Sequence, residues 1–131
     1  MDTPRFNVPL AFVQERFVCV LGGLSQPGIP SLTCEGYDIV KSIWFKMKPI
    51  EDPRYSTTAV VMDNKAIYLM PGCASESTEV SPSAGMGNLK LLVLNLEKAN
   101  QFDKADINYV KNLANQEWTS LIITEPQFNI Q

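Results

Sequence analysis

A repeated segment is the feature that most constrains what this chain can fold into. The run Pro4-Arg5-Phe6 is echoed by Pro53-Arg54-Tyr55 about 50 residues later, and each is followed by a strand-like segment, a short polar turn and a second apolar segment. The run Pro126-Gln127-Phe128-Asn129 echoes the first copy once more. Repeats of this length indicate units that bury their apolar faces against one another. The units we predict are residues 1–52, residues 53–124 and the start of a third copy, residues 125–131.

Both copies are predicted to be β, because their apolar residues alternate and many are β-branched or aromatic. The predicted strands are residues 6–13, 17–21, 32–40 and 42–47 in the first copy, and 57–62, 66–70, 89–96 and 118–124 in the second. Pro9 cannot donate to a sheet ladder, so it should lie at an edge or a bulge. Residues 24–30 and 73–88 are predicted loops. Residues 97–115 do not alternate, and we predict an insertion with a short helix.

The composition excludes several classes of function. Hydrophobic residues make up 45% and charged residues 19% of the 131 residues, which fits a globular chain. The net charge is −3 and the Lys and Arg residues are not clustered, so no nucleic-acid surface is expected. No apolar run approaches the ~20 residues that span a bilayer, so no membrane partner is expected. Met1 is not followed by a basic stretch that leads into an apolar region, so no signal peptide is expected.

The chain contains no histidine and only three cysteines. Without histidine, Ser-His-Asp and Cys-His catalytic sets are impossible within this chain, and the commonest metal ligand is missing. Cys19, Cys34 and Cys73 lack the Cys-x-x-Cys spacing of a structural zinc site. Cys19 is expected in the core, and an odd set without close pairing fits a reduced, cytoplasmic protein. We therefore predict no enzyme activity, no cofactor and no metal.

Four features of the first copy fall in a fixed order. They are Arg5 at the first strand, Gly22-Gly23 at the end of the second, Tyr37-Asp38 on the third and Trp44 on the fourth. Glycines at a strand end permit backbone angles that a side chain forbids. Tyr and Trp bury large areas while their polar tips find partners. In this order of features the first copy resembles the Kelch repeat. A small β-sandwich with glycine turns is the alternative.

The second copy resembles the same repeat less closely. Its matching residues are Arg54, Tyr68, Gly72 and Trp118. Pro71 replaces the first glycine, Leu94-Asn95 stands where Tyr-Asp is found, and the insertion moves the tryptophan downstream. The resemblance implies an all-β fold of two consecutive four-stranded antiparallel propeller blades, an incomplete propeller or part of a larger one. Since propellers have 4–8 blades, further blades must come from the parent chain, a homo-oligomer or an assembly.

The resemblance also implies a non-catalytic protein-interaction module, an adaptor or scaffold whose partners are other proteins. The alternatives are a structural segment of a large assembly and a non-catalytic portion of a propeller enzyme. Arg5 and Arg54 are expected to brace strands through backbone carbonyls rather than to grip an acidic partner. Contacts should come from loops, because binding residues gather on loops carried by a rigid scaffold. The candidate contact residues are Gln26, Ile29, Glu76, Glu79, Met86, Phe102 and Tyr109.

Overall fold

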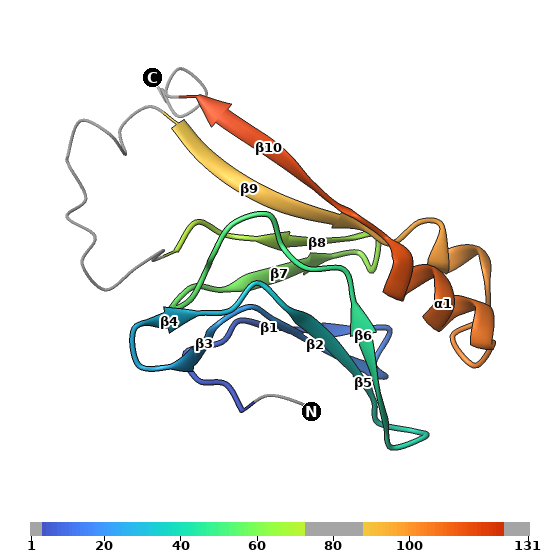
Figure 1. Cartoon of the computed structure of the whole chain (residues 1–131). Helices are drawn as coiled ribbons and strands as arrows, with labels where there is room; N and C mark the ends of the chain where they lie inside the picture. Colours follow the sequence, from blue (N-terminus) through green and yellow to red (C-terminus); the bar gives the residue numbers. More distant parts are fainter. Residues whose placement is uncertain (1–3, 73–87, 125–131) are drawn as a thin grey trace.

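Two four-stranded antiparallel sheets dominate the molecule (Figure 1). The computed structural model describes residues 4–72 and 88–124. The first sheet consists, in order, of β1 (Leu10–Val13), β2 (Phe17–Leu21), β5 (Cys34–Asp38) and β6 (Ile43–Met47). The second consists, in order, of β7 (Ala59–Met62), β8 (Ala66–Leu69), β9 (Asn88–Asn95) and β10 (Trp118–Thr124). The prediction of a mainly β chain with antiparallel sheets is confirmed.

The first copy differs from its prediction at two places. Residues 24–30 form a small hairpin of β3 (Leu24–Gln26) and β4 (Ile29–Pro30), so the prediction of a loop was wrong. Gly28 allows the tight turn, because its φ is +76°. The predicted strand 6–13 is interrupted, since Phe6 makes an isolated bridge to Leu24 and the sheet strand begins only after Pro9. Pro9 thus precedes an edge strand, as expected.

The first two strands of each sheet share one backbone plan. β1 and β7 begin at residues 10 and 59, and β2 and β8 begin at residues 17 and 66, a shift of 49 in both cases (59 − 10 and 66 − 17). Three pairs of non-glycine residues with positive φ are separated by the same shift, namely Asn7 and Ser56, Gln14 and Asp63, and Glu15 and Asn64. The repeat seen in the sequence is therefore also a repeat of backbone conformation.

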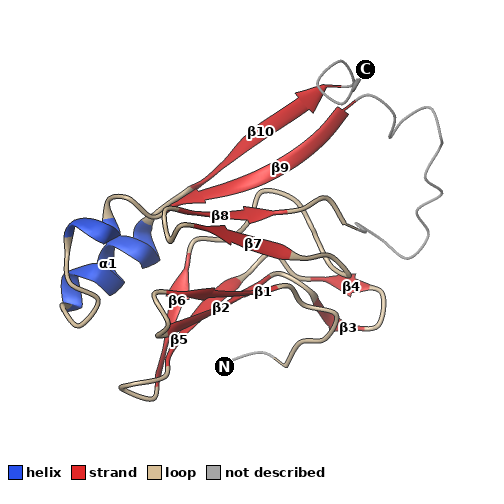
Figure 2. Cartoon of the chain, turned by 180° about the vertical axis from the view of Figure 1, so that it is seen from behind, coloured by secondary structure: helices blue, strands red, loops and turns tan. Residues whose placement is uncertain are grey.

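The two sheets stack on one another, and the apolar core lies between them (Figures 1 and 2). The first sheet contributes buried side chains that include Val13, Phe17, Cys19 and Leu21. The second sheet contributes Ile67, Leu69, Leu92, Leu94 and Trp118. The indole Nε1 of Trp118 donates to the carbonyl of Lys48 at 3.2 Å, which ties the last strand to the segment after β6. Burial of this apolar surface is the main force that holds the sheets together.

The insertion contains short helices, as predicted. They are the 3-10 turn η1 (Ala99–Gln101) and the helix α1 (Ile107–Asn115). The side chain of Asp106 accepts a hydrogen bond from the amide of Asn108 at 2.9 Å and so caps α1. Tyr109 and Leu113 lie four residues apart on one helix face, and both are buried. The insertion thereby closes one end of the core (Figure 2).

In the part of the chain that the structure describes, no helix has the length and apolar character needed to cross a lipid bilayer. Residues 125–131 and most of the predicted loop 73–88 lie outside the described residues.

Candidate protein-interaction surface

Each sheet carries a row of four side chains that pair directly across its strands. In the first sheet the row is Phe12, Val18, Tyr37 and Trp44. In the second sheet it is Val61, Ile67, Leu94 and Trp118. Directly opposite residues of antiparallel strands share one face of the sheet, and alternate residues point to the other. We call the face that carries this row the A face of each sheet, and the opposite one the B face.

The two A faces differ in their exposure to solvent. In the second sheet Ile67 and Leu94 are fully buried and Trp118 is 6% exposed, because this face packs into the core. In the first sheet Val18 and Tyr37, which match Ile67 and Leu94, are half-buried, whereas Phe12 and Trp44 at the two ends of the row are 51% and 41% exposed. The first sheet therefore presents an apolar A face to solvent. Scattered apolar residues are normal on a surface, but a contiguous apolar face indicates a place where something binds.

The open A face of the first sheet ends in an aromatic pair. The rings of Tyr37 and Trp44 lie with their centroids 4.8 Å apart at an interplanar angle of 48°. Leu10, on the same face, is 53% exposed. Tyr and Trp are enriched at protein interfaces, because they combine a large apolar area with a hydrogen-bonding tip. The residue types at this site are therefore those expected for contact with another protein.

The B face of the first sheet is covered by the second sheet. Its row is Ala11, Cys19, Gly36 and Phe45, of which Ala11 and Cys19 are buried. Gly36 makes room for the Phe45 ring, since a Cβ on Gly36 would lie 2.2 Å from Phe45 Cζ. The sheets are thus stacked head to tail, with the A face of the second sheet on the B face of the first.

The B face of the second sheet is the other open surface. Its row is Val60, Tyr68, Val93 and Thr119. Val60 is 37% exposed, and Met62 and Leu121 on the same face are 53% and 45% exposed. The described part of the chain therefore has one open face of each kind.

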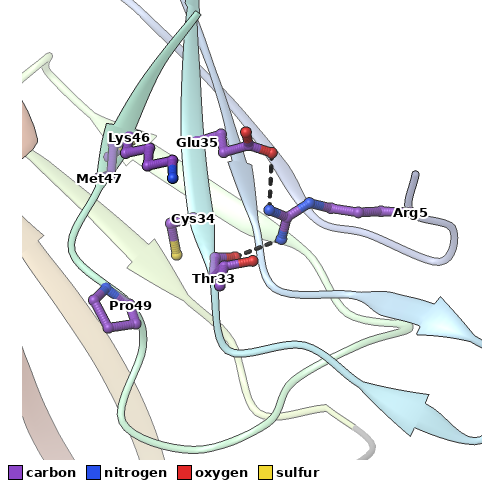
Figure 3. A pocket seen from close by; sticks show the side chains of 7 residues that line it. All are labelled: Arg5, Thr33, Cys34, Glu35, Lys46, Met47 and Pro49. Atoms are coloured by element: carbon purple, nitrogen blue, oxygen red, sulfur yellow. Dashed lines mark hydrogen bonds and ion pairs between the residues drawn. The ribbon is translucent and has the colours of Figure 1, made fainter. Parts of the chain in front are cut away.

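Arg5 lies beside the open A face and is held within its own sheet (Figure 3). Its Nη1 donates to the carbonyls of Gly22 at 3.0 Å and Thr33 at 2.5 Å, and its Nη2 donates to Glu35 Oε2 at 2.9 Å. Both side chains of the ion pair are nearly inaccessible to water. They line a small pocket of about 180 Å³ together with Cys34 and Lys46. Because both terminal nitrogens of the guanidinium are already bound within the chain, Arg5 is a bracing residue here.

Arg54 has a related role in the second sheet. Its Nη1 donates to the carbonyl of Leu69 at 3.1 Å and its Nε donates to Asp52 at 2.9 Å. Asp52 also accepts a hydrogen bond from Lys90 at 3.0 Å. Burial alone would raise the pKa of Asp52, but the hydrogen bonds from Arg54 and Lys90 outweigh it and lower that pKa. Both repeated arginines therefore bind carbonyls and carboxylates within the chain.

Asp38 is bound by a residue that the sequence did not single out, Arg16. The guanidinium donates two parallel hydrogen bonds to the carboxylate, Nε to Oδ1 and Nη2 to Oδ2, both at 2.9 Å. The amides of Val40 and Lys41 also donate to Asp38 Oδ1. Burial favours the neutral acid, but these four bonds outweigh it and lower the pKa of Asp38. The pair fixes the tight turn between β5 and β6.

The glycines of the repeat occupy crowded positions. Gly22 and Gly23 have φ of +69° and +84°, a region that side chains disfavour. A Cβ on Gly23 would lie 2.7 Å from Val8 Cβ, and one on Gly72 would lie 2.7 Å from the carbonyl oxygen of Tyr55. The Gly23 amide donates to the Arg54 carbonyl at 3.0 Å and so connects the two units.

Nucleophilic chemistry is disfavoured at the two described cysteines. Burial raises the pKa of Cys19 to about 12 and that of Cys34 to about 11, so both thiols are protonated at neutral pH. Neither forms a disulfide. Among the residues described, no three acidic, cysteine or histidine side chains are grouped so that they could hold a metal ion.

The predicted contact residues are dispersed. Gln26 and Ile29 lie exposed on the β3–β4 hairpin, whereas Glu76, Glu79 and Met86 lie outside the described residues. Phe102 is half-buried and packs against the core. The choice of Tyr109 was wrong, because its ring is 1% exposed and stacks on Phe17 with centroids 5.1 Å apart. Phe12 and Val18 were not selected as contact residues from the sequence. The signal that could have identified them is that their strands are apolar on both faces and not on one face only.

Comparison with known proteins assigns no family. No protein-family model matches the chain, and a search of curated proteins returns no significant match.

Proposed function

We propose that this chain is a non-catalytic protein-interaction module of Kelch-like type, in which the two sheets are consecutive blades of an incomplete propeller. The proposal is supported by the shared strand order of the two sheets, their 49-residue shift and their head-to-tail stacking. We also propose a reducing, cytoplasmic setting, because the two cysteines that the structure describes are buried free thiols.

One observation carries the interaction role. Of two equivalent rows of four side chains, the row of the second sheet has three buried members, whereas the row of the first sheet has none and its two end residues are exposed. A surface of the same construction as one that is buried within this chain is suited to burial against a partner. The candidate binding residues are therefore on the A face of the first sheet, with the exposed β3–β4 hairpin as the remaining described candidate from the loops.

The test is a pull-down with matched variants of the full chain. The double variant Phe12→Glu/Trp44→Glu places two charges on the open A face, and Ile107→Glu places one on an exposed helix residue that belongs to neither face. We expect wild type and Ile107→Glu to retain the same partners and the double variant to lose them. Partners that are retained by all three proteins would argue against this surface.

A structural role in a large assembly is the second candidate, and the two open faces favour it as well. The two roles differ in the state of the purified chain. An interaction module is folded and soluble without its partner, whereas a wedged segment becomes ordered only beside its neighbours. Far-UV circular dichroism and the solubility of the purified chain separate the two.

A further inference from the structure

We infer that the open A face of the first sheet binds the open B face of the second sheet in another copy of the same chain. This inference rests on the proposed function and names its partner. The geometry comes from the molecule itself, because the contact between the two sheets already shows how an A face is covered. It is covered by a B face and not by a second A face.

The residues on both open faces support this pairing. The A face of the first sheet offers Phe12 and Trp44, and the B face of the second sheet offers Met62, Val60 and Leu121, all of them more than a third exposed. Under the 49-residue shift, Val60 and Met62 correspond to Ala11 and Val13 of the first sheet. Ala11 and Val13 are buried, because the A face of the second sheet covers them. Each copy therefore carries an open A face and an open B face, and either one can be covered by the opposite face of another copy.

Such a contact is heterologous, because the two copies use different surfaces. A heterologous contact closes into a ring if the rotation between copies allows it, and otherwise continues as an open assembly. Pairing of two A faces would instead give a closed dimer and leave both B faces exposed. The two arrangements differ in which surfaces must be intact for the copies to associate.

Complementation between two variants tests the inference. The A-face variant Phe12→Glu/Trp44→Glu keeps an intact B face, and the B-face variant Met62→Glu/Leu121→Glu keeps an intact A face. We expect wild type and Ile107→Glu to associate, and each double variant alone to be monomeric. The mixture should contain a one-to-one dimer, with twice the 14.6 kDa mass of one chain, because one good interface remains. Light scattering after size exclusion measures all five samples.

Every outcome decides the question. A B-face variant that still dimerises alone would overturn the inference in favour of A-to-A pairing. A monomeric wild type, or a mixture whose association is less than about tenfold stronger than that of each variant alone, would also overturn it. If wild type forms large aggregates, the inference requires that each double variant abolish them. All four substituted side chains are at least 41% exposed, and Ser variants at the same positions serve if a Glu variant does not fold.

The two proposals can fail separately. If the purified chain is monomeric, yet the A-face variant alone loses a partner in the pull-down, the interaction role stands and the partner is a different protein. If the complementation dimer forms but no variant changes the pull-down, self-association stands and binding of other proteins through the A face does not.

Discussion

The two sheets are built alike but stabilised differently. Both have four antiparallel strands in chain order and a row of side chains that ends in tryptophan. In the second sheet this row supplies much of the core, whereas in the first it faces water. The first sheet instead contains the buried Arg16–Asp38 and Arg5–Glu35 ion pairs. The comparison shows that one strand pattern can serve as core or as surface, depending on which neighbour is present.

The largest expected difference is between the two tryptophans. Trp118→Ala should lower the free energy of unfolding by about 4 kcal/mol, because it leaves a cavity in the core. Trp44→Ala should lower it by less than about 1 kcal/mol, because it removes only an exposed cross-strand contact with Tyr37. Urea denaturation, at a protein concentration low enough to keep the chain monomeric, measures both. Equal losses would contradict the assignment of open and buried A faces.

The next effect concerns the buried ion pair of the first sheet. Asp38→Ala should cost about 3 kcal/mol, because it leaves Arg16 buried without its partner. The matching substitution Asn95→Ala should cost only about 1 kcal/mol, because the Asn95 side chain makes one described hydrogen bond, to the amide of Glu97. Similar losses in urea denaturation would show that the two turns are held in the same way.

The contribution of Asp38 to stability should also depend on pH. The folded-state pKa of Asp38 is lowered, so the unfolded chain binds the proton more readily and the carboxylate stabilises the fold above its unfolded pKa of about 3.9. That contribution is lost as the pH falls through the lower folded-state pKa. Wild type should therefore lose more stability between neutral pH and pH 3 than Asp38→Ala, in which Asp52 still titrates. Parallel stability curves for the two proteins would contradict this account.

The glycines allow a finer comparison. Gly23→Ala and Gly72→Ala both place a Cβ 2.7 Å from a neighbouring atom, but only Gly23 has a positive φ, of +84°. Gly23→Ala should therefore be the more destabilising, by about 1 kcal/mol, which is the cost of a left-handed backbone for an L-residue. Thermal unfolding of the two variants measures the difference, and an equal shift would mean that the steric contact alone decides.

Local pattern was enough to predict the eight strands of the two sheets and the short helix, but not the β3–β4 hairpin. Alternation and turn residues can be recognised from neighbouring positions in the sequence. Trp44 and Trp118 lie at matching register, each on the last strand of its sheet. The covered face was not predictable, because Phe12 and Val61 are both apolar and only the stacking distinguishes them. Tyr109 was misassigned for a similar reason, since its partner Phe17 lies 92 residues away (109 − 17).

The smallest expected effect comes from rebuilding the first sheet's ion pair in the second. Lys65 and Asn95 occupy the positions of Arg16 and Asp38, because Leu96 donates to the Lys65 carbonyl as Ile39 donates to that of Arg16. The double variant Lys65→Arg/Asn95→Asp should form the pair, but Lys65 is exposed where Arg16 is buried. Exposed pairs contribute about 0.2–1 kcal/mol, so a double-mutant cycle should give a coupling energy in that range. A coupling energy near 3 kcal/mol would mean that the turn of the second sheet is as enclosed as that of the first, and the contrast between the two sheets would then come from their A faces alone.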